Sequence, residues 1–133
     1  MSISVLIEAP KGAAKASAAI AKGRFVVKSG TGRRVAQAGA AVAALGVTAD
    51  AAAAAEDSVK LYLPGQIAKV QTSSNLAAGD GGQVNLGVDA NGLARAAVAG
   101  DAIVAVWLPG EGEAAAPNDF ISVYLLAGAS VAA

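Results

Sequence analysis

The sequence contains no cysteine and no histidine, and only five of its 133 residues are aromatic: one Trp, two Tyr and two Phe. Without cysteine there can be no disulfide bond and no thiolate metal site. Without histidine the chain lacks the usual general base at neutral pH and the commonest metal ligand. Five rings are too few for an aromatic cleft that grips sugars. These absences count against an enzyme.

No segment of the chain matches a motif that carries chemistry. Residues 30–35 begin like a dinucleotide fingerprint, but the third glycine is missing and no helix is predicted after them. The chain has no Gly-Lys-Ser or Gly-Lys-Thr of a phosphate loop. Residues 89–100 lack the third oxygen ligand and the closing glutamate of a calcium loop. We therefore predict no catalytic residue, cofactor, metal ion or small-molecule substrate.

Long hydrophobic runs are also missing. The first five residues have no basic residue ahead of their apolar side chains, so no signal peptide is predicted. The longest uncharged stretch, 35–49, is too short and too rich in Ala and Gly to cross a bilayer. We therefore expect no membrane partner.

Alanine takes the place of the larger apolar residues. The chain is 55% hydrophobic but 4% aromatic, and 36 of its residues are Ala. Because Ala adds little buried area, the core should be thin and the backbones close together. Such a chain could rely on partners for part of its stability.

The charges are distributed unevenly although they sum to zero. Residues 11–34 carry seven bases and no acid, whereas residues 80–133 carry six acids and one base. This dipolar arrangement suits head-to-tail contact between copies or docking onto an acidic protein surface. Separately solvated side chains would give the same pattern, so both interpretations stay open. Phe25 is the only aromatic residue among the bases, which leaves no stacking platform, and we predict no nucleic-acid partner.

Two pairs of segments repeat along the chain. Residues 59–63 (VKLYL) return at 121–125 (ISVYL), at an offset of 62, with a tyrosine in the same place. Residues 17–23 return at 73–79 at an offset of 56. Their alternation is typical of strands with one buried face. The sequence predicts one β domain, 17–133, made of two repeats at about 17–65 and 73–128, behind an N-terminal arm, 1–16.

Further strands follow from alternation and turn residues. Two hairpins are predicted, one around the turn at 29–32 and one around Asn91-Gly92, a strong hairpin signal. We also expect strands at 42–48 and 66–70, and a central strand buried on both faces at 102–108. Residues 50–57 are predicted to form a loop with about one helical turn, because their counterpart at 109–119 contains two prolines. The predicted fold is all-β, a small β-barrel or β-sandwich with one or two short helical turns.

The order of these elements resembles the small capsid decoration, or cement, proteins of tailed bacteriophages. The resemblance rests on an apolar-x-x-Gly opening (20–23), a Gly-Val strand (46–47), the strand and turn at 58–67 and a second opening at 76–79, followed by the second round. It covers about residues 17–128. The second unit departs from the pattern, because Val104-Ala105-Val106 stands where the family has Gly-Val and Gly81-Gly82 lengthens its opening.

The resemblance implies a non-enzymatic structural virion protein, made in the host cytoplasm and bound to the outside of the mature head. It further implies that the protein is commonly a trimer where capsid subunits meet, with the major capsid protein and its own copies as partners, and that it stabilises the capsid lattice. Two alternatives stay open. One is a carrier domain of the biotinyl or lipoyl type, with Lys28 as the modified residue. The other is an extracellular lattice or tail-fibre module.

The residues expected at a protein interface come from the sequence and not from the resemblance. The arm alternates Ile3, Val5 and Ile7 and could add a strand to its own domain or to a neighbour. The basic stretch supplies the charged candidates, and Trp107 is a core residue or an interface anchor. The full set is Ile3, Val5, Ile7, Lys11, Lys15, Arg33, Arg34 and Trp107.

Overall fold

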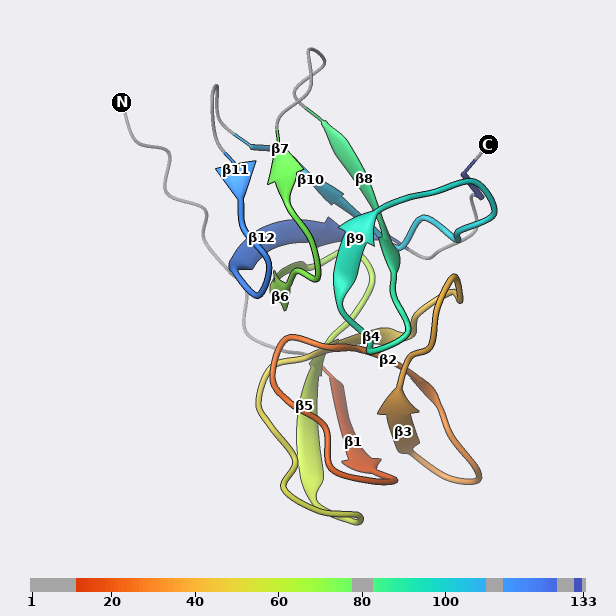
Figure 1. The fold of residues 1–133 in the computed structure, drawn as a ribbon. Coiled ribbons are helices and arrows are strands. Elements are labelled where there is room, and N and C mark those ends of the chain that lie inside the picture. Colours follow the sequence, from red (N-terminus) through yellow and green to blue (C-terminus); the bar gives the residue numbers. More distant parts are fainter. Residues whose placement is uncertain (1–11, 78–82, 110–113, 127–130, 133) are drawn as a thin grey trace.

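The computed structural model describes residues 12–77, 83–109, 114–126 and 131–132. These residues form twelve strands and no helix. The predicted all-β class is therefore confirmed, as a five-stranded closed barrel beside a curled five-stranded sheet and a two-stranded ribbon (Figure 1). The alternating residues Ile3, Val5 and Ile7 of the predicted arm and the base Lys11 lie outside the described residues.

The first half of the chain forms the closed barrel, in the order β1-β3-β2-β4-β5. Strands β1 and β3 pair in parallel, and the other pairs are antiparallel. The strands are β1 (Gly12–Ala16), β2 (Phe25–Lys28), β3 (Arg34–Gln37), β4 (Gly46–Thr48) and β5 (Ser58–Tyr62).

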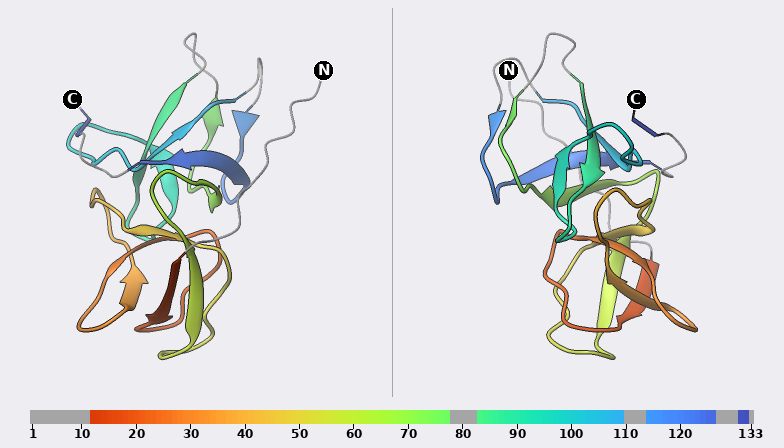
Figure 2. Two further views of the ribbon diagram at one scale, coloured as in Figure 1. Left: turned by 180° about the vertical axis from the view of Figure 1, so that it is seen from behind. Right: turned by 45° about the vertical axis from the view of Figure 1, so that its right-hand side comes forward.

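The second half forms the curled sheet, in the order β6-β12-β10-β8-β9, and the ribbon β11-β7. In Figure 2 the sheet lies above the barrel in both views. The strands are β6 (Ile67–Gln71), β7 (Leu76–Ala77), β8 (Val84–Val88), β9 (Ala94–Ala96), β10 (Ala105–Trp107), β11 (Ala114–Ala115) and β12 (Phe120–Leu125).

The two halves repeat one strand order and one register. Strands β1 to β5 correspond in turn to β6, β8, β9, β10 and β12. In the barrel Ala14 is opposite Val59, and the residues 56 and 62 positions later, Val70 and Ile121, are opposite each other in the sheet. The parallel pairing that closes the barrel recurs in the sheet as a single bridge between Thr72 and Ala94.

The repeat extends into an irregular loop. The N–H groups of Glu56 and Asn118 donate to the carbonyls of Ala16 and Thr72, both at 2.8 Å. Glu56 and Asn118 have φ angles of 72° and 69°, a region that non-glycine residues seldom adopt. The helical turn expected in 50–57 is absent. The Asp57 carboxylate accepts the N–H groups of two alanines there, which holds a non-helical turn despite their helix propensity.

Three predicted segments differ from the structure. Residues 12–16, which were predicted to belong to the arm, form β1, one of the five strands of the barrel. Strands β5 and β3 supply hydrogen-bonding partners on its two sides. The strands expected at 42–48 and 102–108 keep three residues each. Strand β10 is central in its sheet, but it is not buried on both faces, since Val106 is only partly buried.

The buried side chains form two clusters. The smaller one fills the barrel with Ile20, Val26, Val35, Val59, Leu61 and two alanines. The larger one fills the curled sheet, and Phe25, Ala38 and Val47 of the barrel belong to it. Phe25 and Val47 point away from the barrel interior, so the outer wall of the barrel closes the core of the second half.

Candidate interaction surfaces

Three of the predicted interface residues meet on the exposed face of β1 and the start of β3. Lys15 on β1 is opposite Arg34 on β3, and the Lys15 N–H donates to the Arg33 carbonyl at 2.8 Å. Their side chains line a shallow groove of about 450 Å³, which we call the basic groove; its lining residues are Ala13, Ala14, Lys15, Thr31, Gly32, Arg33 and Arg34. Parallel pairing of β1 with β3 brings the bases together.

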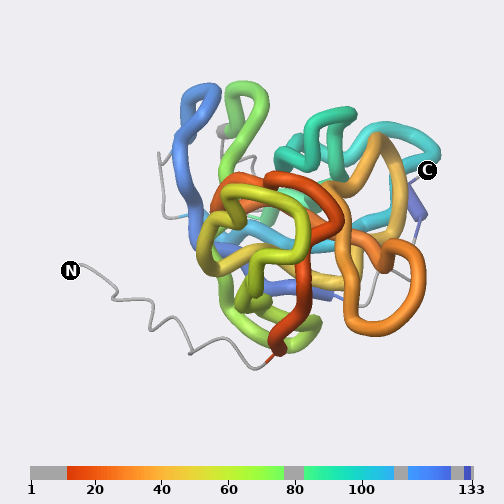
Figure 3. The backbone as a smooth tube through the Cα atoms, turned by 90° about the horizontal axis from the view of Figure 1, so that it is seen from below, coloured from red at the N-terminus to blue at the C-terminus, as the bar shows by residue number. Residues whose placement is uncertain are grey.

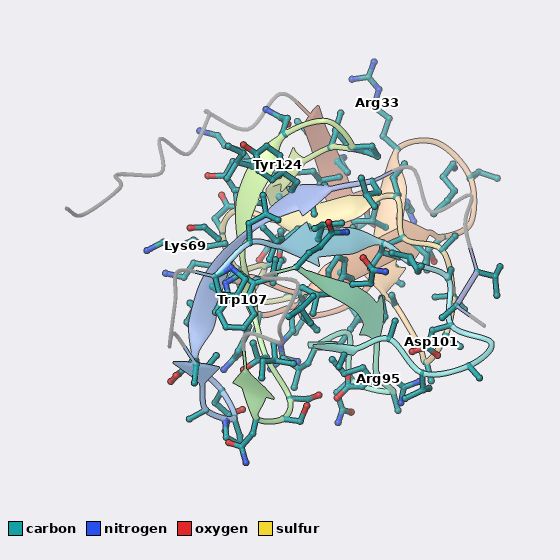
Figure 4. The ribbon with its side chains drawn as sticks, turned by 90° about the horizontal axis from the view of Figure 1, so that it is seen from above. Arg33, Lys69, Arg95, Asp101, Trp107 and Tyr124 are labelled. Atoms are coloured by element: carbon teal, nitrogen blue, oxygen red, sulfur yellow. The ribbon has the colours of Figure 1, made fainter. Side chains whose placement is uncertain are left out.

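The basic groove carries a net positive charge. Arg34 forms an ion pair with Glu56 at 2.8 Å, and both side chains are nearly half exposed. Such an exposed pair contributes little to stability. Lys15 and Arg33 have no ion pair with any residue that the structure describes, and Arg33 projects from the edge of the molecule (Figure 4). The groove is therefore suited to carboxylates on another protein.

The other predicted interface residues are not part of this surface. Ile3, Val5, Ile7 and Lys11 fall outside the described residues. Trp107 is 3% exposed and belongs to the larger core cluster. In Figure 4 it lies far from Arg33.

An apolar hollow beside the basic groove was not predicted. It occupies about 310 Å³ at one end of the barrel, and we call it the barrel mouth. Figure 3 shows the backbone from below, with the barrel half of the chain nearest the viewer. Gly12, Ala14, Leu45, Leu61 and Leu63 supply its apolar lining, and Arg33 and Arg34, which also line the basic groove, lie along its edge. Leu45 is 41% exposed. Lys28 lies at its rim, with its ammonium group donating to the carbonyls of Gly30 and Gly32.

A second partly exposed surface, centred on Tyr124, lies on the outer face of the sheet. Asn85, Val106, Tyr124 and Ile67 are opposite one another across β8, β10, β12 and β6, and we call them the outer row. Tyr124 is 46% exposed. Alternation in 121–125 indicates that Tyr124 points to the outer face, but the sequence alone does not show that this face is uncovered.

No metal-binding cluster is evident among the described residues. They contain no group of three or more acidic residues that could hold a metal ion. Arg95 and Asp101 form a bidentate ion pair at 2.8 and 3.1 Å, drawn together in Figure 4. The hydrogen bond from Arg95 lowers the pKa of the Asp101 carboxyl below its usual value, against burial, which raises it. This pair closes a surface loop, since Asp101 also accepts the Val98 N–H.

No helix among the described residues has the length and apolarity needed to span a membrane. No protein-family model matches the chain, and the search of curated proteins found no match either. The fold is similar to that of the head fiber gp8.5 N base of bacteriophage phi29, with a TM-score of 0.68. The two chains are 14% identical, and the match covers 92% of this chain and 97% of the other. This similarity shows a shared fold.

Proposed function

We propose that this protein is a structural component of a phage virion that binds the outside of the mature head and stabilises the capsid lattice. The observation that carries the proposal is the fold, which matches a head fiber base along nearly the whole of both chains. The resemblance of the sequence to capsid decoration proteins points the same way. The major capsid protein and further copies of this chain are the proposed partners, with a trimer at three-fold positions.

The basic groove supports this assignment. Lys15, Arg33 and Arg34 lie together on one exposed wall, and Glu56 neutralises only Arg34 among the described residues. Charge complementarity steers docking and selects partners more than it adds affinity. Several weak contacts per trimer would bind tightly through effective concentration. We assign the groove to an acidic patch on the capsid, and we assign no catalytic role to the protein.

The fold similarity favours a second candidate, the base of a fibre on the head, because the matching structure is the base of a head fiber. The two candidates share the attachment to the head. They differ in what lies beyond it, since a base carries a further protruding part.

Co-sedimentation with heads tests the proposal. We expect the protein to pellet with expanded heads of its phage and not with free coat subunits. The double variant Lys15→Glu/Arg33→Glu should bind at least tenfold more weakly, because it reverses two charges of the basic groove. Binding of the unaltered protein should also weaken as salt screens the groove.

The matched control is Lys22→Glu/Lys69→Glu, which changes the net charge equally at exposed positions outside the basic groove. It should bind nearly as well as the unaltered protein. Equal losses in both double variants would show that net charge matters and the groove does not. A folded protein that ignores expanded heads altogether would overturn the proposed function.

A further inference from the structure

The contact between the two halves of the chain consists of apolar side chains and a few backbone hydrogen bonds. The outer wall of the barrel presents Phe25 and Val47, with Tyr62 packed beside them, to the open end of the sheet. That end is lined by Val88, Val104 and Leu125, among other residues of the same core cluster. Backbone hydrogen bonds join the two, from the Phe25 N–H to the Gly92 carbonyl at 2.9 Å and from the Ala41 N–H to the Val88 carbonyl at 3.0 Å.

Each side of this contact has an equivalent in the other half of the chain. In the barrel, Phe25 is opposite Val47 and Val47 is opposite Tyr62. In the sheet, the same places are held by Asn85, Val106 and Tyr124, which belong to the outer row. The outer row is thus the counterpart of the barrel wall that covers the sheet.

The barrel mouth is the counterpart of the covered end of the sheet. Gly12 is opposite Leu61 as Ala68 is opposite Val123. The Leu45 N–H donates to Val26 as the Val104 N–H donates to Leu86, at 2.8 and 2.9 Å. Leu63 and Leu125 are equivalent by the offset of 62. The residues at the covered end of the sheet are buried beneath the barrel wall, whereas at the mouth Leu45 is 41% exposed and none of the described residues covers the hollow.

We propose that a second copy of this chain places its outer row over the barrel mouth, repeating between copies the contact that joins the two halves within one chain. Tyr124 and Val106 of one copy would cover Leu45 and Leu63 of the next. The hairpin tip at 29–32, equivalent to the tip at 89–92, would lie beside Asn85 as Gly92 lies beside Phe25. This inference rests on the proposed trimer and names its interface.

The contact between copies is weaker than the contact within the chain. Asn85 replaces the buried Phe25 on the row, and Lys28 replaces the buried Val88 at the mouth. Both changes remove apolar area and add polar groups to be desolvated. Because the two surfaces differ, the contact is heterologous, and it closes into a ring or grows into a fibre depending on the rotation per copy. The proposed trimer requires closure.

Crosslinking tests the arrangement directly, because the chain has no cysteine of its own. Thr31→Cys and Asn85→Cys alter two exposed positions, one at the hairpin tip and one in the outer row. With a short bismaleimide, a mixture of the two variants should yield covalent dimers, and each variant alone should yield none. The double variant should yield a covalent trimer. Dimers from a single variant alone, or no dimers from the mixture, would overturn the inference.

A charge introduced into the outer row gives an independent test. Tyr124→Lys should weaken self-association at least tenfold in sedimentation velocity, because it places an ammonium group over the apolar mouth. Ser122→Lys is the matched control, on the same face of β12 two residues away. Ser122 corresponds to Lys60 in the first half of the chain. Lys60 is exposed, so the contact between the two halves does not cover it, and the proposed contact between copies should not cover Ser122. Circular dichroism and thermal unfolding confirm that both variants fold.

The outcomes separate this inference from the proposed function. A chain that stays monomeric at every concentration but pellets with expanded heads would overturn the inference and leave the proposed function standing. A chain that forms the crosslinked trimer but binds no head would do the opposite. Equal association of the Tyr124→Lys and Ser122→Lys variants would also overturn the inference.

Discussion

Phe25→Ala should lower the free energy of unfolding by about 3–5 kcal/mol. Phe25 is 1% exposed and lies in the core cluster shared by the barrel wall and the sheet. Truncation leaves a cavity at the junction of the two halves, where backbone hydrogen bonds fix the surroundings and limit collapse. Urea unfolding with an unchanged m-value would measure the loss as a shift of the midpoint.

The matched control is Asn85→Ala, at the equivalent place in the second half. Asn85 is exposed in the single chain, so the change should alter stability by less than about 0.5 kcal/mol. A loss below about 1 kcal/mol for Phe25→Ala, or similar losses for the two variants, would contradict the packing of the barrel wall against the sheet.

Arg95→Met should cost about 3 kcal/mol at neutral pH, because it leaves the Asp101 carboxylate buried without its counter-ion. The Asp101 side chain is only 2% exposed, and Gly87 packs against it with no room for a Cβ. Removing Asp101 should cost less than removing Arg95. The Arg95 side chain is 29% exposed, so loss of Asp101 would leave a cation that water can still reach. Asp101→Asn should therefore cost less than Arg95→Met.

The contribution of Asp101 to the pH dependence of stability should have opposite signs in the unaltered chain and in the Arg95→Met variant. In the unaltered chain the folded pKa of Asp101 is below its unfolded value. Its contribution is therefore present above the unfolded pKa and is lost as the pH falls through the folded pKa. Without Arg95, burial dominates and raises the folded pKa, so protonation in acid relieves the penalty. The cost of Arg95→Met, measured by urea unfolding from pH 7 to pH 3, should shrink as the pH falls. A cost that stays constant would contradict the account.

Local signals in the sequence predicted several elements correctly. The Asn91-Gly92 turn and the alternation in 59–63 and 121–125 match the hairpin β8–β9 and the strands β5 and β12. The basic residues Lys15, Arg33 and Arg34 were named as interface candidates, and the structure brings them into one groove. Each of these features depends on residues close in sequence or on the spacing of strands within one half.

Other elements depend on contacts that no local pattern encodes. Strand β1 is short, rich in alanine and begins at a glycine, which suggested an arm. A Cβ at Gly12 would come within 3.1 Å of the Leu63 side chain, which would have to shift to accommodate a larger residue. The position of Phe25 is a similar case, since its side chain leaves its own barrel and is buried only by the other half of the chain. The barrel mouth and the outer row follow from that stacking, so sequence reasoning missed both.

An electron cryomicroscopy reconstruction of the phage head would show whether this protein lies on the outside of the shell. We expect density for this chain on the outside of the shell at local three-fold positions, as three copies joined by outer row and barrel mouth. A compact knob would fit a decoration protein, and a knob carrying a long protrusion would fit a fibre base. Heads that contain the chain in their interior, or lack it entirely, would overturn the proposed function.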